Sequence, residues 1–360
     1  MSQSSRQAGL KFLIIRRDNI GDLVCTTPIF RALRERYPTA TICALVNNYN
    51  VPVLQNNPDI DAVFAYTKAK HRPKGKSLAG IYWDRFRLLT KLRSMRFDFA
   101  ILATPRFQPR SLGLARLIKP QHIIGFIEKG QRGTRQLPDG IPYLLPYPMH
   151  EAEDVFRLLA PLGIKGNPPV AKIFPSEEEL IRARQALPQP PPDSPPALRI
   201  GIHISARKIS QRWPTDNFVE LAQRLHRSHH ASVVLFWSPG DASNPFHPGD
   251  DAKAREIMEK LDDIPVTAYP TNTLHQLIGG LALCDAVICS DGGAMHLAAG
   301  LRKPILCFFG KSDSIRWRPW RVPHVLLQPR SLNVADIRVC EALDGFKKLL
   351  TLANANDSAN

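Results

Sequence analysis

Short apolar runs of strand length alternate with longer segments of helical periodicity along most of the chain. In the first half the apolar runs are 11–16, 41–46, 97–103 and 122–126, and 84–95 has the spacing of an amphipathic helix. A strand, a glycine turn, a helix and a second strand are the usual opening of a doubly wound α/β domain. The pattern therefore predicts a Rossmann-like domain in this half of the chain.

The same alternation restarts after the segment 188–196, which holds six prolines in nine residues. Such a segment is a stiff connector rather than a helix or a strand. Beyond it we expect strands at 198–204 and 231–237 and a helix at 217–227. Two α/β domains joined by a linker leave a cleft, which the carboxyl ends of both strand sets face. The predicted boundaries are 1–187 for the first domain, 188–196 for the linker, 197–350 for the second domain and 351–360 for a flexible tail.

Length and composition agree with two globular domains. The chain has 360 residues, of which 44% are hydrophobic. No apolar run reaches the roughly 18 residues that a membrane helix needs. Residues 1–10 are polar and lack the apolar centre of a signal peptide, so we expect a cytoplasmic protein. The six cysteines stand singly and mostly within apolar runs, which favours buried free thiols over disulfides or metal ligands.

Positive charge is concentrated in one part of the chain. The formal net charge is +16, and residues 66–135 hold 17 Lys and Arg against 3 Asp and Glu. This excess favours an anionic partner, which is nucleic acid, anionic lipid headgroups or a phosphorylated acceptor. A solvated basic face accounts for the charge as well. No base-stacking motif or basic recognition helix marks the sequence as a nucleic-acid binder.

A carboxylate follows the first predicted strand. Asp22 comes directly after Gly21 at the start of a predicted helix, where the carboxyl end of the strand faces the expected cleft. In that position it can act as a general base toward a hydroxyl group. The structural alternative is that Asp22, or Asp18, caps the helix, which is the commonest use of Asp there.

The loop after the first strand of the second domain is dense in hydroxyls and cations. Ser205, Lys208 and Arg212, with Arg207, could neutralise a diphosphate leaving group. The alternative is a basic surface loop in which Trp213 anchors the following helix.

A glycine turn opens the segment 290–300, between two apolar runs that we expect to be strands. Gly292 and Gly293 let backbone N–H groups approach a ligand closely, and a helix start favours negative charge. Asp291 precedes this turn, and His296 lies about one helical turn along on the same side. The alternative is a helix capped by Asp291, with a structural histidine. Histidines and carboxylates do not fall at metal-ligand spacings, so we expect no metal and no other cofactor.

Five segments in this order resemble glycosyltransferase family 9, the ADP-heptose:lipopolysaccharide heptosyltransferases. The similarity extends over some 300 residues of the chain. It rests on 12–24 (FLIIRRDNIGDLV), on 98–102 (DFAIL) with 123–126 (IIGF), on 150–163 (HEAEDVFRLLAPLG), on 211–214 (QRWP), and on 290–296 (SDGGAMH) with 309–310 (FG). Each segment is weak alone, and the five together are specific.

The resemblance implies a GT-B fold and an inverting, metal-independent transfer with Asp22 as general base. It implies that Asp291 and His296 bind a nucleotide-sugar donor. The charge that builds on the leaving diphosphate would be met by the start of the helix at Gly292 and by the cations of the loop 203–212. The chain departs from the family pattern at two positions. The family often has lysine where Gln211 stands, so Lys208 or Arg212 would substitute, and it often has threonine at position 292.

The resemblance also gives the basic stretch a role. Arg106, Arg110 and Arg132 would hold phosphates or acidic sugars of a lipid-linked acceptor at the inner membrane surface. We therefore expect a cytoplasmic enzyme, peripheral on that membrane and monomeric, without a nucleic-acid partner. It would move a heptose or related sugar to a lipopolysaccharide core or related glycan. Two alternatives remain open: a GT-B-like sugar-nucleotide epimerase, and a non-catalytic protein that binds nucleic acid or another anionic partner.

Overall fold

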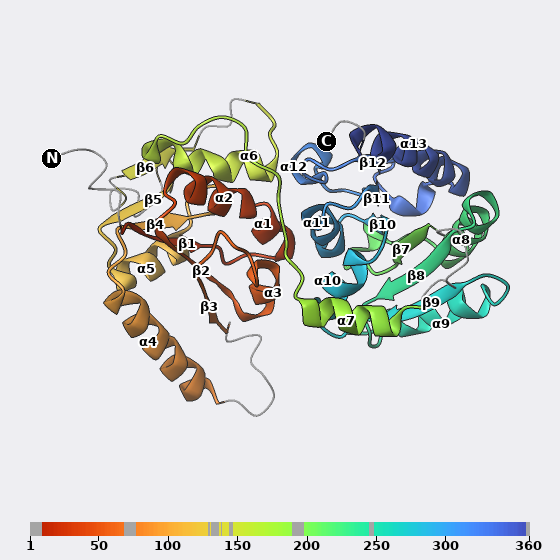
Figure 1. The fold of residues 1–360 in the computed structure, drawn as a ribbon, viewed down its shortest axis with the longest axis horizontal. Helices are drawn as coiled ribbons and strands as arrows, with labels where there is room; N and C mark the ends of the chain where they lie inside the picture. Colours follow the sequence, from red (N-terminus) through yellow and green to blue (C-terminus); the bar gives the residue numbers. More distant parts are fainter. Residues whose placement is uncertain are drawn as a thin grey trace. The chain divides into compact units, whose positions relative to one another are not determined.

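The computed structural model divides the chain into two compact units, Met1–Phe174 and Pro175–Asn360. Each unit has its own six-stranded sheet flanked by its own helices (Figure 1). The described residues are 9–67, 77–128, 130, 137, 139–143, 147–188, 198–244 and 248–357.

The first unit contains a wholly parallel sheet in the order β3-β2-β1-β4-β5-β6. Because β2 and β4 lie on either side of β1, the strand order reverses there, which makes the carboxyl ends of β1 and β4 the topological switch point. The strands are β1 Lys11–Ile15, β2 Thr41–Asn47, β3 Ala62–Tyr66, β4 Phe99–Leu102, β5 His122–Ile127 and β6 Asp139–Pro142. The sequence predicted β1, β2, β4 and β5, and it missed the two edge strands.

Helices cover both faces of this sheet. Leu13 and Ile15 of β1 pack in one cluster with Leu92 of α4 and Leu112 of α5, while α2 packs against α6 and β2. The acidic residues in the first turn of α6 suit the positive end of the helix dipole. The helices are α1 Ile20–Val24, α2 Thr27–Arg36, η2 Asn48–Asn50, α3 Val51–Leu54, α4 Leu78–Ser94, α5 Pro109–Ile118, α6 Glu151–Phe156 and η5 Arg157–Leu162.

The second unit repeats the design with the order β12-β11-β10-β7-β8-β9, again wholly parallel. Its switch point lies between β7 and β10. The strands are β7 Arg199–His203, β8 Ser232–Trp237, β9 Val266–Pro270, β10 Ala286–Ser290, β11 Ile305–Phe308 and β12 His324–Leu327. The helices are α7 Glu177–Ala186, η6 Ile209–Gln211, α8 Thr215–His229, α9 Asp251–Glu259, α10 Leu274–Ala282, α11 Gly293–Gly300, α12 Ser314–Trp317, η7 Val334–Asp336 and α13 Val339–Asp357.

The division between the units falls before α7, one helix earlier than the boundary at 187 expected from the sequence. Helix α7 packs on α10 of the second unit. The packing is close, because a Cβ at Gly279 would lie 2.8 Å from the carbonyl oxygen of Glu179, and the Glu179 carboxylate contacts His275. Of the proline-rich linker, residues 189–196 lie outside the described residues.

The expected tail at 351–360 also differs in the structure. Helix α13 continues to Asp357, so residues 351–357 are helical, and 358–360 lie outside the described residues. Phe346 and Leu349 bury this helix in the core, and alanines at 353 and 355 favour its continuation.

Five of the six cysteines are buried, as the sequence predicted, and Cys340 is exposed. Burial raises the pKa of the Cys43 thiol to about 11 and that of Cys284 to about 12, so both stay protonated at neutral pH.

We expect Ellman's reagent to label one thiol in the native protein and all six after denaturation. Cys340→Ser should abolish the native reaction and leave the thermal unfolding temperature unchanged. Fast labelling of a second thiol in that variant would show that the cores are more open than described.

Candidate functional site

A buried arginine occupies the switch point of the first unit. Arg16 follows β1 and is 1% exposed. Its Nη1 donates a hydrogen bond to the carbonyl oxygen of Ala103, just after β4, and its Nη2 donates to Asp22 Oδ1 at 2.8 Å and to Glu151 Oε1 at 2.7 Å. Its Nε lies 3.2 Å from Asp18 Oδ2. One guanidinium therefore joins the ends of two strands, helix α1 and helix α6.

The charges around Arg16 explain how it is tolerated in the interior. Burial by itself lowers the pKa of Arg16, but the carboxylates of Glu151, Asp22 and Asp18 overcome this effect and raise the pKa above its usual value. Glu151 is itself fully buried, so the guanidinium and the carboxylates compensate one another.

Asp22 is held by two donors at the first turn of α1. Its Oδ1 accepts from Arg16, and its Oδ2 accepts from the backbone N–H of Asn19 at 3.0 Å. The side chain remains 15% exposed. The capping role considered in the sequence is therefore present, and the carboxylate also keeps one fixed orientation and some access to solvent. Its role as a general base stays a prediction.

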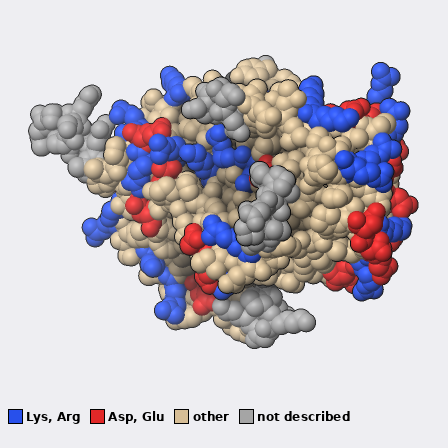
Figure 2. Space-filling model, turned by 45° about the vertical axis from the view of Figure 1, so that its right-hand side comes forward, with Lys and Arg blue, Asp and Glu red and all other residues tan. Residues whose placement is uncertain are grey.

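The arginines expected to bind the acceptor lie after β4. Arg106 and Arg110 are both exposed, and the Arg106 guanidinium lies 5.8 Å from the ring centre of Tyr143. Arg110 is the second residue of α5, at a helix start where the dipole disfavours a cation, so the helix itself gains nothing from it. Arg132 lies outside the described residues. Figure 2 shows Lys and Arg side chains gathered in a band on the first unit, in the left half of that view.

In the second unit, Gln211 links the loops that follow three neighbouring strands. Its Nε2 donates to Asp291 Oδ2 at 2.7 Å and to Ser312 Oγ at 3.0 Å, and its carbonyl oxygen accepts from Ser290 Oγ at 2.7 Å. Gly310 allows the loop after β11 to lie close to the loop after β7, because a Cβ at position 310 would lie 2.2 Å from the carbonyl oxygen of Ser210. The two predicted donor motifs thus meet at the switch point between β7 and β10.

The other residues of the β7 loop have partners of different kinds. Ser205 Oγ accepts from the backbone N–H of Ser238, which ties this loop to the end of β8. Arg212 donates to the carbonyl oxygen of Ala206, and its Nη1 lies 3.4 Å from Asp250 Oδ1. Lys208 precedes η6 and is exposed, so its ammonium group is accessible to an anion.

The start of α11 leaves open space beside Gly292. Gly292 has extended backbone with φ 163°, and a Cβ there would lie 4.0 Å from the nearest atom, so this position leaves free space. Gly293 begins the helix. His296 is 4% exposed, and its ring lies edge-on to Trp317 at 5.9 Å between centres. The histidine is therefore packed against α12.

Sequence reasoning missed Arg16 and Glu151. The position of Arg16, directly after an apolar strand, is a signal from which its place in the site could have been predicted. The acidic start of α6 was explained by the helix dipole, which gave no reason to expect a partner 135 residues away. Thr104 was missed as well: its buried Oγ1 has no hydrogen-bond partner among the described residues.

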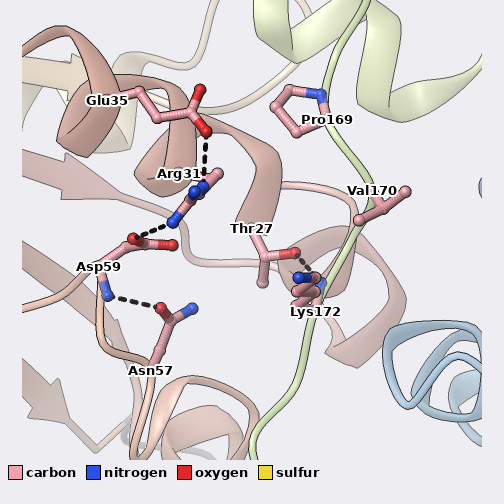
Figure 3. Close-up of a pocket in the computed structure, with 8 residues that line it drawn as sticks. All are labelled: Thr27, Arg31, Glu35, Asn57, Asp59, Pro169, Val170 and Lys172. Atoms are coloured by element: carbon pink, nitrogen blue, oxygen red, sulfur yellow. Dashed lines mark hydrogen bonds and ion pairs between the residues drawn. The ribbon is translucent and has the colours of Figure 1, made fainter.

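A cavity of about 210 Å³ lies elsewhere in the first unit and contains none of the predicted site residues. In Figure 3, Arg31 points between Glu35 and Asp59, with nitrogen–oxygen distances of 2.7 and 3.4 Å. The backbone N–H of Lys172 donates to Thr27 Oγ1. This last hydrogen bond joins the end of the first unit to α2.

The chain is similar to known enzymes both in sequence and in fold. The chain is 26% identical over 347 residues to lipopolysaccharide heptosyltransferase 3 of Escherichia coli K12, covering 94% of this chain and 92% of that protein. A family 9 glycosyl transferase from Veillonella parvula superposes with a TM-score of 0.77 at 20% identity over 95% and 97% of the two chains. The E. coli ADP-heptose lps heptosyltransferase II gives 0.72 at 21% identity over 96% and 100%.

These structures define the fold as GT-B, as the sequence predicted. The sequence profile of glycosyltransferase family 9 (heptosyltransferase) matches residues 85–333. The chain belongs to this family of glycosyltransferases, which favours a sugar transferase over the epimerase and the non-catalytic binding protein.

His203 gives a test of the packing at the switch point of the second unit. It ends β7, and burial lowers its pKa to about 4, against a smaller opposing effect of hydrogen bonding to the backbone of Ser205. Between pH 6.5 and 4 the unfolded chain binds a proton that the folded chain does not, so the protein loses stability as the pH falls through this range. Above pH 6.5 His203 is neutral in both states and has no effect.

We expect His203→Gln to reduce the loss of unfolding free energy between pH 7 and pH 4.5 by about 2 kcal/mol, measured by urea titration. The control is His230→Asn, which changes an exposed histidine with φ 50° and should keep the wild-type pH dependence. Equal pH dependence in wild type and His203→Gln would mean that the histidine is solvated.

Proposed function

We propose that this enzyme transfers a heptose, or a related sugar, from a nucleotide diphosphate sugar to a lipopolysaccharide core or related glycan. The observation that carries the proposal is the Asp22 carboxylate, oriented by two hydrogen bonds and partly exposed at the switch point of its sheet. A relative named for lipopolysaccharide and a solved enzyme named for ADP-heptose support this acceptor and ADP-heptose as the donor.

In the proposed reaction Asp22 accepts the proton of an acceptor hydroxyl while that oxygen attacks the anomeric carbon. The bond from this carbon to the phosphate oxygen breaks on the opposite face, so the configuration inverts and the nucleoside diphosphate leaves. Arg16 and the Asn19 N–H keep the two carboxylate oxygens in place, which lowers the cost of reaching the reactive geometry.

We place donor binding in the second unit. The start of α11 at Gly292 and Gly293 would face the diphosphate, and the exposed Lys208 would supply the charge that Gln211 lacks. Arg212 would add a second cation at this loop. We assign the remaining donor contacts to Ser205, Asp291 and His296.

No metal or cofactor is part of the proposal. Within the described ranges, no group of three His, Cys, Asp or Glu side chains is arranged to hold a metal ion. The cations and backbone N–H groups of the second unit could stabilise the leaving diphosphate in its place.

The acceptor would be anionic and lipid-linked, bound through Arg106, Arg110 and Arg132. We propose that the enzyme acts as a monomer in the cytoplasm, at the surface of the inner membrane, and does not bind nucleic acid. Within the described part of the chain, no helix is long and apolar enough to cross a membrane.

Asp22→Asn should lower the rate of transfer by about two to four orders of magnitude, because the amide keeps its place but takes no proton. The assay incubates wild type and variant with a panel of ADP-, UDP- and GDP-sugars and detects products by mass. Calorimetry should give the same donor affinity for both proteins.

Asp18→Asn is the matched control, because it removes another carboxylate from the same arginine and should retain most activity. Near-normal turnover by Asp22→Asn would remove Asp22 from its role. A wild type that uses no sugar nucleotide in the panel would overturn the proposed function.

The double variant Arg106→Glu/Arg110→Glu should raise the KM for the acceptor by about tenfold or more, since charge-assisted hydrogen bonds to phosphate are lost. Donor affinity should stay unchanged. Arg116→Glu, also exposed and also on α5, is the control for a general change of charge. An unchanged acceptor KM in the double variant would exclude these two arginines from acceptor binding.

A further inference from the structure

Helix α4 of the first unit exposes three aromatic side chains on one face. Tyr82, Trp83 and Phe86 are each 60% exposed, and the rings of Trp83 and Phe86 are stacked at 5.7 Å. Phe86 follows Tyr82 by four residues and Trp83 by three, so its ring lies next to both of them on the helix. Exposed aromatic surface of this kind costs free energy in water and marks an interaction surface.

The rest of α4 shows that this face is not the one that packs on the sheet. Leu92 is fully buried in the core of the first unit, and Leu88 and Leu89 pack against the same core. Leu88 and Leu92 lie on the opposite side of the helix from the aromatic side chains, whereas Leu89 lies seven residues after Tyr82 and borders them. The core therefore anchors α4 through one stripe, and the aromatic side chains of its first half project from another.

The charges on α4 complement an anionic surface. The helix carries Arg85, Arg87, Lys91 and Arg93 against the single acid Asp84. Arg87 lies four residues after Trp83 and Arg93 seven after Phe86, so both cations border the aromatic face, and both are exposed. Arg85 and Lys91 instead lie over the rings of Tyr66 and Phe64 of β3, at 5.4 and 5.3 Å.

Aromatic side chains bordered by arginines match the interface of an anionic bilayer. Trp and Tyr favour the headgroup level, where an apolar ring and a polar edge are both satisfied, and nearby cations bind lipid phosphates. Nucleic acid is a poorer match, because Trp83 and Phe86 stack on each other and each has one ring face already covered.

We propose that Tyr82, Trp83 and Phe86 of α4 insert into the interface of an anionic lipid bilayer, with Arg87 and Arg93 contacting lipid phosphates. This inference rests on the proposed function, which puts the acceptor at a membrane surface. It assigns the contact to one helix, distinct from the arginines proposed to bind the acceptor.

The first experiment is flotation of the full-length protein with two kinds of vesicles that contain no glycan acceptor. We expect binding to vesicles of phosphatidylcholine with phosphatidylglycerol, weaker binding to phosphatidylcholine alone, and loss of binding at high salt. Trp83→Ala/Phe86→Ala should weaken binding by about tenfold or more. Ile181→Ala/Leu352→Ala, which truncates two exposed apolar side chains of the second unit, is the matched control and should bind normally.

The second experiment uses the fluorescence of Trp83. Of the five tryptophans, Trp213, Trp237 and Trp320 are buried and Trp317 is half-buried, so Trp83 is the one that reports contact with lipid. The emission should shift to shorter wavelength when anionic vesicles are added. Trp83→Phe should keep most of the binding and abolish the shift.

Equal binding by Trp83→Ala/Phe86→Ala and wild type would overturn the inference, as would binding that ignores lipid charge. Circular dichroism of the variant checks that α4 is intact, and Trp83→Phe keeps the test valid if the double variant unfolds. The vesicles contain no acceptor, so a wild type that binds them through Trp83 but transfers no sugar would refute only the proposed function. Transfer to a water-soluble acceptor without vesicle binding would refute only the inference.

Discussion

The buried guanidinium of Arg16 is the interaction on which the first unit depends. It lies at the carboxyl ends of β1 and β4, where it contacts the carbonyl oxygen of Ala103 and three carboxylates at once. A buried charge is stable only when its partners are present, and here the partners come from α1 and from α6. The fold and the candidate chemistry are therefore coupled, because Arg16 joins the ends of β1 and β4 and also orients Asp22.

At the switch point of the second unit a neutral amide takes the place of a buried cation. The neutral amide of Gln211 bridges the loops after β7, β10 and β11, and Gly310 allows them to approach. Under the proposed function the positive end of α11 and the exposed Lys208 attract the diphosphate. Under the proposed function the two switch points have opposite tasks: the first orients a carboxylate, and the second binds a diphosphate.

The basic excess of residues 66–135 separates into distinct features once the helices are known. Some cations lie over rings of the sheet edge, as Arg85 and Lys91 do, and contribute to packing. Arg106 and Arg110 stand in the open after β4, and Arg87 and Arg93 border the aromatic side chains of α4. A single number for net charge conceals these different environments, because it carries no information about neighbours.

The sequence by itself determined the central strands, the two Rossmann-like domains, the buried thiols and the turns that hold Asp22 and Gly292. These features are local, because a few adjacent residues are enough to specify a buried parallel strand or a glycine turn. The edge strands β3 and β6, the assignment of α7 to the second unit and the helical residues 351–357 were decided by tertiary packing. So were the Arg16–Glu151 and Gln211–Asp291 contacts, which join residues 135 and 80 positions apart. A short sequence pattern cannot predict such partners, because the ends of the strands come together only when the whole sheet has assembled.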